Sequence, residues 1–148
     1  LMDIAKVSYS ELLGFAEPET ALDVKTAVMK ACQRLQYVIS GKYIVVTSEV
    51  SSGESDAAAF LSEVADVVFV SSFKEKEQEV RISSRARKHV TVPLNEVMKA
   101  VSTSLGGNGG GHAKAAGAAI PKNKMYIDVQ DVLKRCVEEF QNRLGQKL

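Results

Sequence analysis

The sequence of 148 residues has no tryptophan, two cysteines, two histidines and almost no net charge. Cys32 and Cys136 lie far apart among apolar residues, which indicates reduced core thiols rather than a disulfide framework. A net charge of +1 excludes a global basic field that would attract long nucleic acid. Any binding of phosphate must therefore depend on local charge.

Long apolar runs are also missing. No stretch approaches the ~20 apolar residues of a membrane-spanning helix, and we see no signal peptide, so we expect a cytoplasmic protein without a membrane partner. A leucine precedes Met2, unlike a natural start. We therefore expect an excised piece of a longer chain, with residues 1–16 as a linker or boundary segment.

Side chains for a catalytic metal centre are scarce. The histidines are His89 and His112, there is no HExxH or CxxC motif, and the aspartates form no cluster with histidine. A two-metal phosphoesterase needs several carboxylates and histidines around ions roughly 3.5–4 Å apart. The sequence thus predicts no metal site in this chain. We expect His89, between charged and β-branched residues, to lie at the surface.

The composition suits one domain of ordinary size. Apolar residues make up 45% of the chain and charged residues 25%. A helix is predicted from Pro18, with apolar residues at helical spacing as far as Ile39 and a stop at Gly41. The β-branched run Tyr43–Thr47 predicts a strand.

A second helix and strand follow. Ser51 and Glu54 have the spacing of a capping box. The predicted core side of the helix they open is Ala57, Ala58, Phe60, Leu61 and Val64. Val67–Val70 reads as a buried strand, and its helical connection to the previous strand favours parallel pairing.

The remaining pattern completes an α/β domain. Lys74–Glu79 is a charged, hairpin-like connection, and Glu79–Arg87 alternates as a strand. Helices are predicted near Pro93 and after the capping residue Asp128, and a short helix is predicted at Ala113–Ala116. We expect a mixed, partly parallel sheet of about four to five strands flanked by helices.

Five of the six residues from Gly106 to Gly111 are glycine. Each ordered glycine costs ~0.5–1 kcal/mol relative to alanine, so such a run suits positive φ angles or close approach to a ligand. Amides leading into a helix at His112 would form an anion site, with Lys114 adding charge. The alternative is a tight structural turn with a capping histidine.

Two familiar phosphate-binding motifs are excluded. A Walker A loop ends in lysine followed by serine or threonine, and nothing of that kind closes the glycine run. A dinucleotide-binding fingerprint follows a strand, whereas this run follows a predicted helix that ends near Leu105. The predicted phosphate site is thus of another kind.

The strand VRISSRAR places four polar side chains on one face. They are Arg81, Ser83, Arg85 and Arg87. An arginine can bind a phosphate through two parallel hydrogen bonds. For Arg81 and Arg87, the pattern fits a role in phosphate binding and simple exposure to solvent on an edge strand equally well.

The segment GGGHAKAAGAAI, with ISSR upstream, resembles the C-terminal, DHH-associated domain of the DHH phosphoesterase family. The resemblance covers about residues 40–121. That family includes RecJ-like exonucleases, oligoribonucleases and cyclic-dinucleotide phosphodiesterases, and a related domain ends alanyl-tRNA synthetase. The resemblance implies an N-terminal DHH domain that holds Mn²⁺ on aspartates and histidines, and a C-terminal domain that binds the substrate.

The family's binding positions can be carried over residue by residue. The substrate-binding residues implied here are Ser83, Arg85, Gly109, Gly110, Gly111 and His112. Two departures stand out. Ala86 replaces a frequent serine, and residues 106–108 lengthen the approach to the turn. The Asp-His-His motif is absent, which implies an excised substrate-binding domain that is inactive alone.

Three functions remain open at this point. The first is binding of a nucleotide or short oligonucleotide within a manganese-dependent phosphoesterase, with the missing DHH domain as partner. The second is a non-catalytic RNA-binding module, which the lack of an exposed aromatic stripe disfavours. The third is a protein interface on the last helix. The substrate, the oligomeric state and any role of Asn108 or Lys114 in binding stay undetermined.

Overall fold

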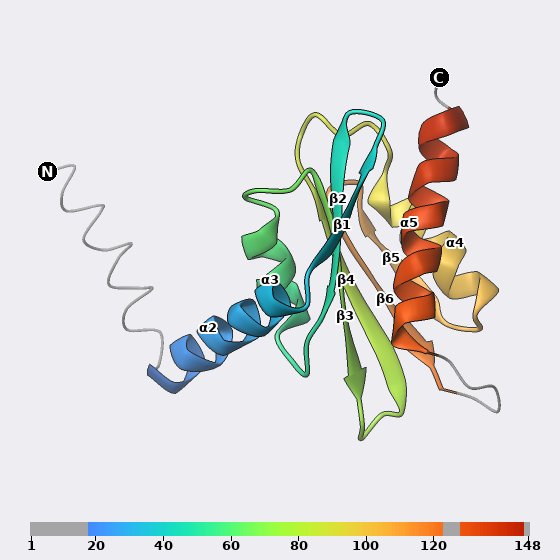
Figure 1. Cartoon of the computed structure of the whole chain (residues 1–148). Helices are drawn as coiled ribbons and strands as arrows, with labels where there is room; N and C mark the ends of the chain where they lie inside the picture. Colours follow the sequence, from blue (N-terminus) through green and yellow to red (C-terminus); the bar gives the residue numbers. More distant parts are fainter. Residues whose placement is uncertain (1–17, 123–127, 147–148) are drawn as a thin grey trace, which may run out of the picture.

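A computed structural model describes residues 18–122 and 128–146, which form one mixed sheet with helices on both faces (Figure 1). The strand order is β1-β2-β3-β4-β6-β5. The elements are α2 (Pro18–Gln33), β1 (Gln36–Ser40), β2 (Tyr43–Glu49), α3 (Glu54–Leu61), β3 (Val67–Lys74), β4 (Glu79–Ala86), α4 (Leu94–Ser104), β5 (Asn108–His112), β6 (Ala115–Pro121) and α5 (Val129–Gln146).

The helices divide into two layers, with α2 and α3 on one side of the sheet and α4 and α5 on the other (Figure 1). Alternation along β3 serves both layers, because successive side chains point to opposite faces. Val68 and Val70 pack in the cluster beneath α2 and α3. Val67 and Phe69 pack in the larger cluster beneath α4 and α5. This explains why β3 reads as a continuous apolar run.

The predicted α/β fold with a mixed sheet is confirmed, although the sheet has six strands rather than four to five. β2 and β3 pair in parallel across the crossover helix α3, as expected. The other pairings are antiparallel, including the predicted hairpin between β3 and β4.

The predicted first helix is too long. It ends at Gln33, and residues 36–40 form strand β1, which pairs with β2. Gly41 has a φ of 63° and belongs to the hairpin turn rather than to a helix end. Tyr37, Val38 and Ile39 favour a strand, and pairing with β2 decides their structure.

The predicted helix at Ala113–Ala116 is wrong. This segment contains the turn between β5 and β6, and Ala115–Pro121 is a strand between β4 and β5. Alanine favours helices, but propensity is a weak prior that tertiary pairing overrides. All seven residues of β6 pair with β4 and the first five also pair with β5, which an isolated helical turn could not achieve.

The capping box at Ser51 and Glu54 is also wrong. Gly53 occupies the N-cap of α3 with a φ of 78°, and no side chain caps the helix. Phe60 and Val64, predicted to face the core, are 52% and 76% exposed. The other three predicted core residues, Ala57, Ala58 and Leu61, are buried.

The last two helices follow their predicted patterns. α4 begins after Pro93, and the carboxylate of Asp128 accepts a hydrogen bond from the N–H of Gln130 at 3.0 Å. Cys136 is buried in the core, whereas Cys32 is exposed, so the expectation of two core thiols is half right. Among the described helices, none is long and apolar enough to cross a membrane. Residues 1–17, and with them the predicted boundary segment 1–16, lie outside the described part.

Candidate functional site

A cleft of about 440 Å³ opens on the α3 side of the sheet, where β4, β6 and β5 carry no covering helix beyond α3. Its floor is made of residues with small side chains or none. The lining residues are Glu54, Ser55, Arg81, Ile82, Ser83, Ser84, Arg85, Gly110, Gly111, Ala115, Ala116, Gly117 and Ala118. The two segments singled out in the sequence therefore meet in one cavity.

Strand register explains this meeting. In an antiparallel ladder, residues directly opposite each other share one face of the sheet. Ser83 lies opposite Gly117, and Gly117 lies opposite Gly110. In the adjacent row, Ala115 of β6 lies between Arg85 and His112. Neighbouring strands lie ~4.8 Å apart, so the backbones of Arg85 and His112, which are separated by one intervening strand, lie ~10 Å apart.

The two arginines of β4 and Arg87, which follows the strand, differ in their partners. Arg81 Nε donates to Glu79 at 2.6 Å, and this ion pair raises the pKa of the guanidinium. Arg87 Nη1 donates to the carbonyl of Ser62 at 2.9 Å, just beyond α3. For Arg85, which is half-buried in the cleft, no ion pair occurs within the described parts of the chain. Arg85 is thus the arginine best placed for an anionic ligand.

The glycines have different structural roles. A Cβ on Gly109 would lie 2.6 Å from the carbonyl oxygen of Met98, so Gly109 allows β5 to pack against α4. Gly111 has a φ of 134°, and a Cβ there would lie 2.8 Å from the carbonyl oxygen of Ala115. A Cβ on Gly110 would meet no atom within 4 Å. The fold therefore requires glycine at 109 and 111 but not at 110.

The predicted helix N-terminus beside the glycines is absent, because β5 turns directly into β6. The backbone donors lie instead along an edge strand. Ala86 donates its N–H to the carbonyl of Lys114, and hydrogen-bonded pairs alternate along an antiparallel ladder. Counting from that bond, the backbone N–H and C=O groups of Gly110 point toward β6. The N–H groups of Gly109 and Gly111 point away from it, toward the open edge of the sheet.

His112 is the last predicted substrate-binding residue, and the sequence leaves any role of Lys114 and Asn108 in binding undetermined. His112 is exposed at the end of β5. Lys114 donates to the carbonyl of Val90 and so holds the segment after β4, rather than extending freely toward the cleft. Asn108 is exposed in the row of Ala119, one row beyond Gly110 and Gly117.

Glu54 forms the acidic wall of the cleft. Its Oε1 accepts hydrogen bonds from Ser72 Oγ and Lys74 Nζ, both at 2.9 Å. Burial raises the pKa of the carboxyl, but these bonds more than offset it and hold the pKa below its usual value. Because Lys74 balances its charge, Glu54 repels an anion less than an isolated carboxylate would.

One polar pair, His89 and Asp66, could not be foreseen from the residue pattern. His89 Nε2 lies 2.7 Å from Asp66 Oδ1, while Asp66 Oδ2 accepts the N–H of Ile44 at 2.8 Å. The expected surface position of His89 is confirmed, since its side chain is 54% exposed. The two residues are 23 positions apart, and the antiparallel pairing of β3 with β4, which sets Val67 opposite Ala86, brings them together. Within residues 18–122 and 128–146, no group of three or more potential metal ligands occurs.

The fold is that of a small α/β domain with a glycine-floored, arginine-bearing cleft at one end of its sheet. The DHHA1 domain family matches residues 39–143, and the chain belongs to that family. A protein of Methanocaldococcus jannaschii is 35% identical over 143 residues, covering 93% of this chain and 44% of the relative. The chain thus spans less than half the length of that relative.

Solved structures share the fold at low sequence identity. The C-Ala domain of alanyl-tRNA synthetase from Aquifex aeolicus has a TM-score of 0.59 at 19% identity, covering 72% of this chain and 98% of that one. A DHH domain of a member of the S1p family of ribosomal proteins has a TM-score of 0.58 at 15% identity, covering 88% and 33%. A pGpG-specific phosphodiesterase from Vibrio cholerae has a TM-score of 0.53 at 11% identity, covering 92% and 45%. At these identities, the likeness concerns the fold alone.

Proposed function

We propose that this chain is the substrate-binding domain of a DHH-family phosphoesterase, and that its cleft binds the phosphate of a nucleotide or short nucleic acid. The observation that carries the proposal is the position of Arg85. It lies in the cleft beside Ser83 and the glycine floor, while Arg81 and Arg87 are held by protein partners. A fork of guanidinium donors facing an open floor suits a phosphate.

The floor supports this proposal sterically. Gly110 and Gly117 present no side chains, so a ligand can approach the backbone closely. Ser83 can donate a hydroxyl hydrogen bond, and the edge amides of Gly109 and Gly111 offer further donors. His112 would add a donor at the rim. We propose these groups, with Arg85, as the contacts to phosphate oxygens.

Catalysis would require a partner. The described residues offer no set of metal ligands, so they do not fit the Mn²⁺ that the family uses. We propose that a DHH domain outside this chain holds Mn²⁺, which would supply Lewis-acid activation of water. The isolated chain should then bind without turnover. Manganese-dependent hydrolysis of a dinucleotide by the purified chain would contradict this.

An NMR titration with a 5′-phosphorylated dinucleotide tests the binding site. Shifts should cluster on Ser83, Arg85 and residues 109–112. Charge-assisted hydrogen bonds contribute ~1.5–3 kcal/mol, so Arg85→Ala should weaken binding roughly 10- to 100-fold. His112→Ala should weaken it less, since this side chain lies at the rim. Unmoved glycine amides at saturating ligand would overturn the proposal.

Arg81→Ala provides the matched control. Arg81 shares the strand and the face of Arg85 but is paired with Glu79. Its loss should change the affinity less than two-fold. Equal losses for both variants would mean that the ligand senses general positive charge, and the specific role of Arg85 would be refuted.

The alternative function is a non-catalytic RNA-binding module, favoured by the shared fold of the C-Ala domain. The lining of the cleft contains no aromatic side chain for base stacking, which argues against it. The dependence of affinity on the length of the ligand distinguishes the phosphoesterase domain from the RNA-binding module. A phosphoesterase domain should bind a dinucleotide as tightly as a 20-mer, whereas an RNA binder should strongly prefer the 20-mer.

A further inference from the structure

Strand β1 leaves one edge of the sheet open. Within the described part of the chain, β2 is its sole sheet neighbour, and four of its five residues are exposed. The outward N–H and C=O groups of such a strand form a template for another strand. The opposite edge strand, β5, differs in composition, because three of its five residues are glycine and carry no apolar side chain.

The usual protections of an edge strand are missing from β1. Its sequence, QYVIS, contains no charged residue and no proline, and its register with β2 runs without a bulge from Gln36 to Ser40. Natural sheets commonly prevent unwanted pairing with lysine, proline or a bulge at such edges. The β1 edge is therefore open to pairing with another strand.

We propose that a second copy of this chain covers β1 by antiparallel pairing about a two-fold axis at Val38, which joins two six-stranded sheets into one of twelve strands. In this register Val38 lies opposite Val38 of the second copy. Tyr37 lies opposite Ile39 of the second copy, and Gln36 lies opposite Ser40. Such an interface uses the same surface twice, as a two-fold dimer requires.

The strand is self-complementary in this register. Each Tyr37–Ile39 pair joins an aromatic to a β-branched side chain, a combination that stabilises sheets by ~0.2–1 kcal/mol. No charge lies opposite a like charge, because the strand carries no charged residue. A second copy therefore meets β1 without repulsion, whereas an acidic or basic partner would find no charge there to pair with.

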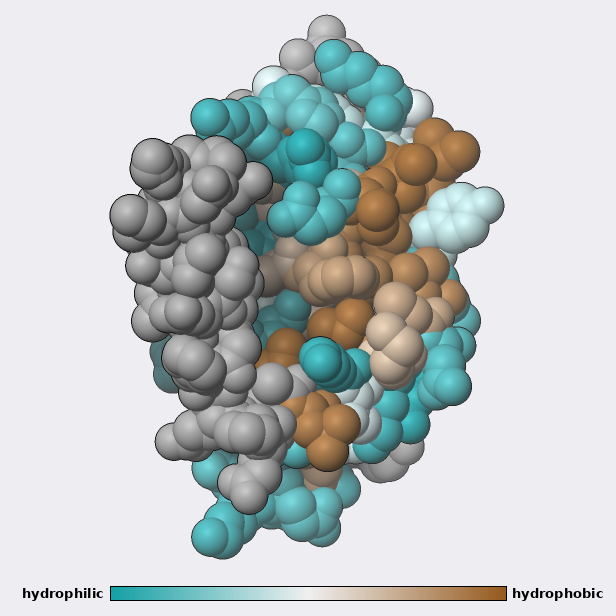
Figure 2. Space-filling model, turned by 90° about the vertical axis from the view of Figure 1, so that its left-hand side faces the viewer, coloured by the Kyte–Doolittle hydropathy of each residue, from teal (hydrophilic) through white to brown (hydrophobic). Residues whose placement is uncertain are grey.

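Both faces of the paired strands would gain apolar cover. On the α3 side, Tyr37 and Ile39 are 63% and 68% exposed, and the apolar surface there extends over Ile44, Phe60 and Val64. Figure 2 shows hydrophobic side chains gathered on this side of the molecule. Removing such surface from water is the main driving force for association.

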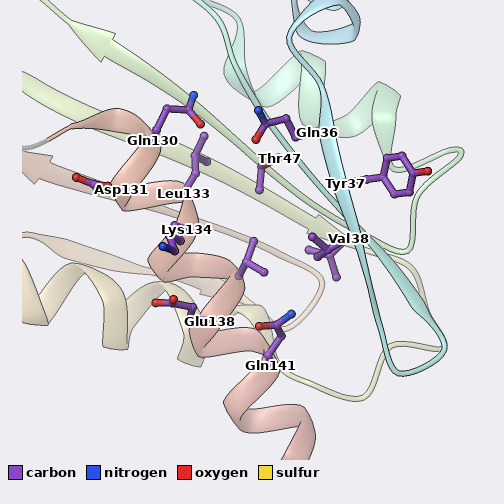
Figure 3. A pocket seen from close by; sticks show the side chains of 12 residues that line it. Gln36, Tyr37, Val38, Thr47, Gln130, Asp131, Leu133, Lys134, Glu138 and Gln141 are labelled. Carbon is purple, nitrogen blue, oxygen red and sulfur yellow. The ribbon is translucent and has the colours of Figure 1, made fainter.

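The other face of β1 borders a groove of about 590 Å³ between the β1–β2 hairpin and α5. Figure 3 shows Gln36 and Val38 on the groove side, whereas the Tyr37 ring points away from α5. The second copy would place its own Val38 beside this Val38 and extend the apolar floor of the groove. Leu133 and Val137 form the α5 wall.

The size of the patch sets the expected affinity. Specific interfaces usually bury ~800 Å² per partner and involve ~20–30 residues a side. Five strand residues and their few apolar neighbours fall below that, so we expect a reversible dimer of micromolar affinity. The cleft stays open in this dimer, because β4, β6 and β5 lie at the other end of the sheet.

Sedimentation velocity over a concentration series tests the pairing, with circular dichroism and thermal unfolding as controls of the fold. Tyr37→Glu and Ile39→Lys should each raise the dimer dissociation constant about ten-fold or more. In the double variant each introduced carboxylate lies opposite an introduced ammonium of the second copy, so dimerisation should recover. Met29→Lys, a change at a 58% exposed apolar residue of α2, should leave it unchanged.

A wild-type chain that stays monomeric at millimolar concentration would overturn the proposal. So would single variants that dimerise like the wild type, or a double variant that recovers nothing. Hydrogen exchange of the wild type gives a readout independent of any substitution. The amides of residues 36–40 should become more protected as the protein concentration rises, and unchanged protection would also refute the pairing.

Discussion

Gly110 of β5 lies directly opposite Gly117 of β6, so two residues without side chains meet at the centre of the cleft. Gly117 is constrained by packing, since a Cβ there would lie 3.0 Å from the carbonyl oxygen of Ile82. Gly110 has open space on the cleft side. The structure thus separates a glycine that the fold needs from one that it does not.

Gly110→Ala should therefore leave the fold intact and weaken the binding of the ligand. Alanine loses less backbone entropy on folding, so the free energy of unfolding should stay equal or rise by up to ~1 kcal/mol. The added methyl group occupies the floor that a phosphate would approach, and dinucleotide affinity should fall several-fold. Chemical denaturation and an NMR titration of the same sample measure both effects.

Gly109→Ala is the matched control and should behave in the opposite way. Its Cβ would lie 2.6 Å from the carbonyl of Met98 and 2.7 Å from Ser102 Oγ. Overpacking of this kind costs ~1–3 kcal/mol, so the protein should unfold at lower denaturant concentration. If both alanine variants behave alike in stability and in binding, the distinction between the two glycines is incorrect.

Much of the fold could be predicted because it depends on local periodicity. The alternation of β4 placed Ser83 and Arg85 on one face, and the helical spacing of α4 and α5 gave their buried stripes. The failures have a common physical cause. Residues 36–40 and 115–121 take their structure from β2 and β4, and neighbouring residues carry no information on which distant strand is available.

The site could be predicted only in part for the same reason. The strand pattern offered three arginines on one face and could not rank them. Arg81 and Arg87 are distinguished from Arg85 by Glu79 and by a carbonyl at the end of α3. Likewise, the glycine run identified a ligand-approach segment, but only the position of α4 shows that Gly109 serves packing instead.

Arg87→Ala should destabilise the protein without affecting ligand binding. Arg87 donates to the carbonyls of Ser62 and Glu63, in the turn that follows α3. The guanidinium is exposed, so the loss should be small, on the order of 1 kcal/mol. Urea denaturation gives the free energy of unfolding, and the titration gives the affinity. A large loss of dinucleotide affinity at unchanged stability would assign Arg87 to the ligand instead.

Glu54 should link stability to acid pH. Its pKa in the folded protein is held below the usual 4.5 because hydrogen bonds from Lys74 and Ser72 outweigh the effect of burial. A depressed carboxyl pKa stabilises the fold above the pKa of the unfolded chain, and this stabilisation disappears as pH falls through the folded pKa. The urea concentration at the unfolding midpoint of the wild type should decrease as the pH is lowered below about 4.5. Glu54→Gln should reduce that pH dependence. Parallel pH profiles for the two proteins would contradict the assignment.

The two cysteines should differ sharply in reactivity. Burial raises the pKa of the Cys136 thiol to about 12, so at pH 8 only roughly one in ten thousand of these thiols is the reactive thiolate. Cys32 is exposed on α2 and accessible to reagents. Iodoacetamide at pH 8 should therefore add one group to the native chain, at Cys32, and a second only after unfolding in urea. Mass spectrometry of peptides from both samples identifies the sites. Rapid native labelling of Cys136 would mean that α5 opens readily, because a thiol locked in this core has neither the charge nor the access that alkylation needs.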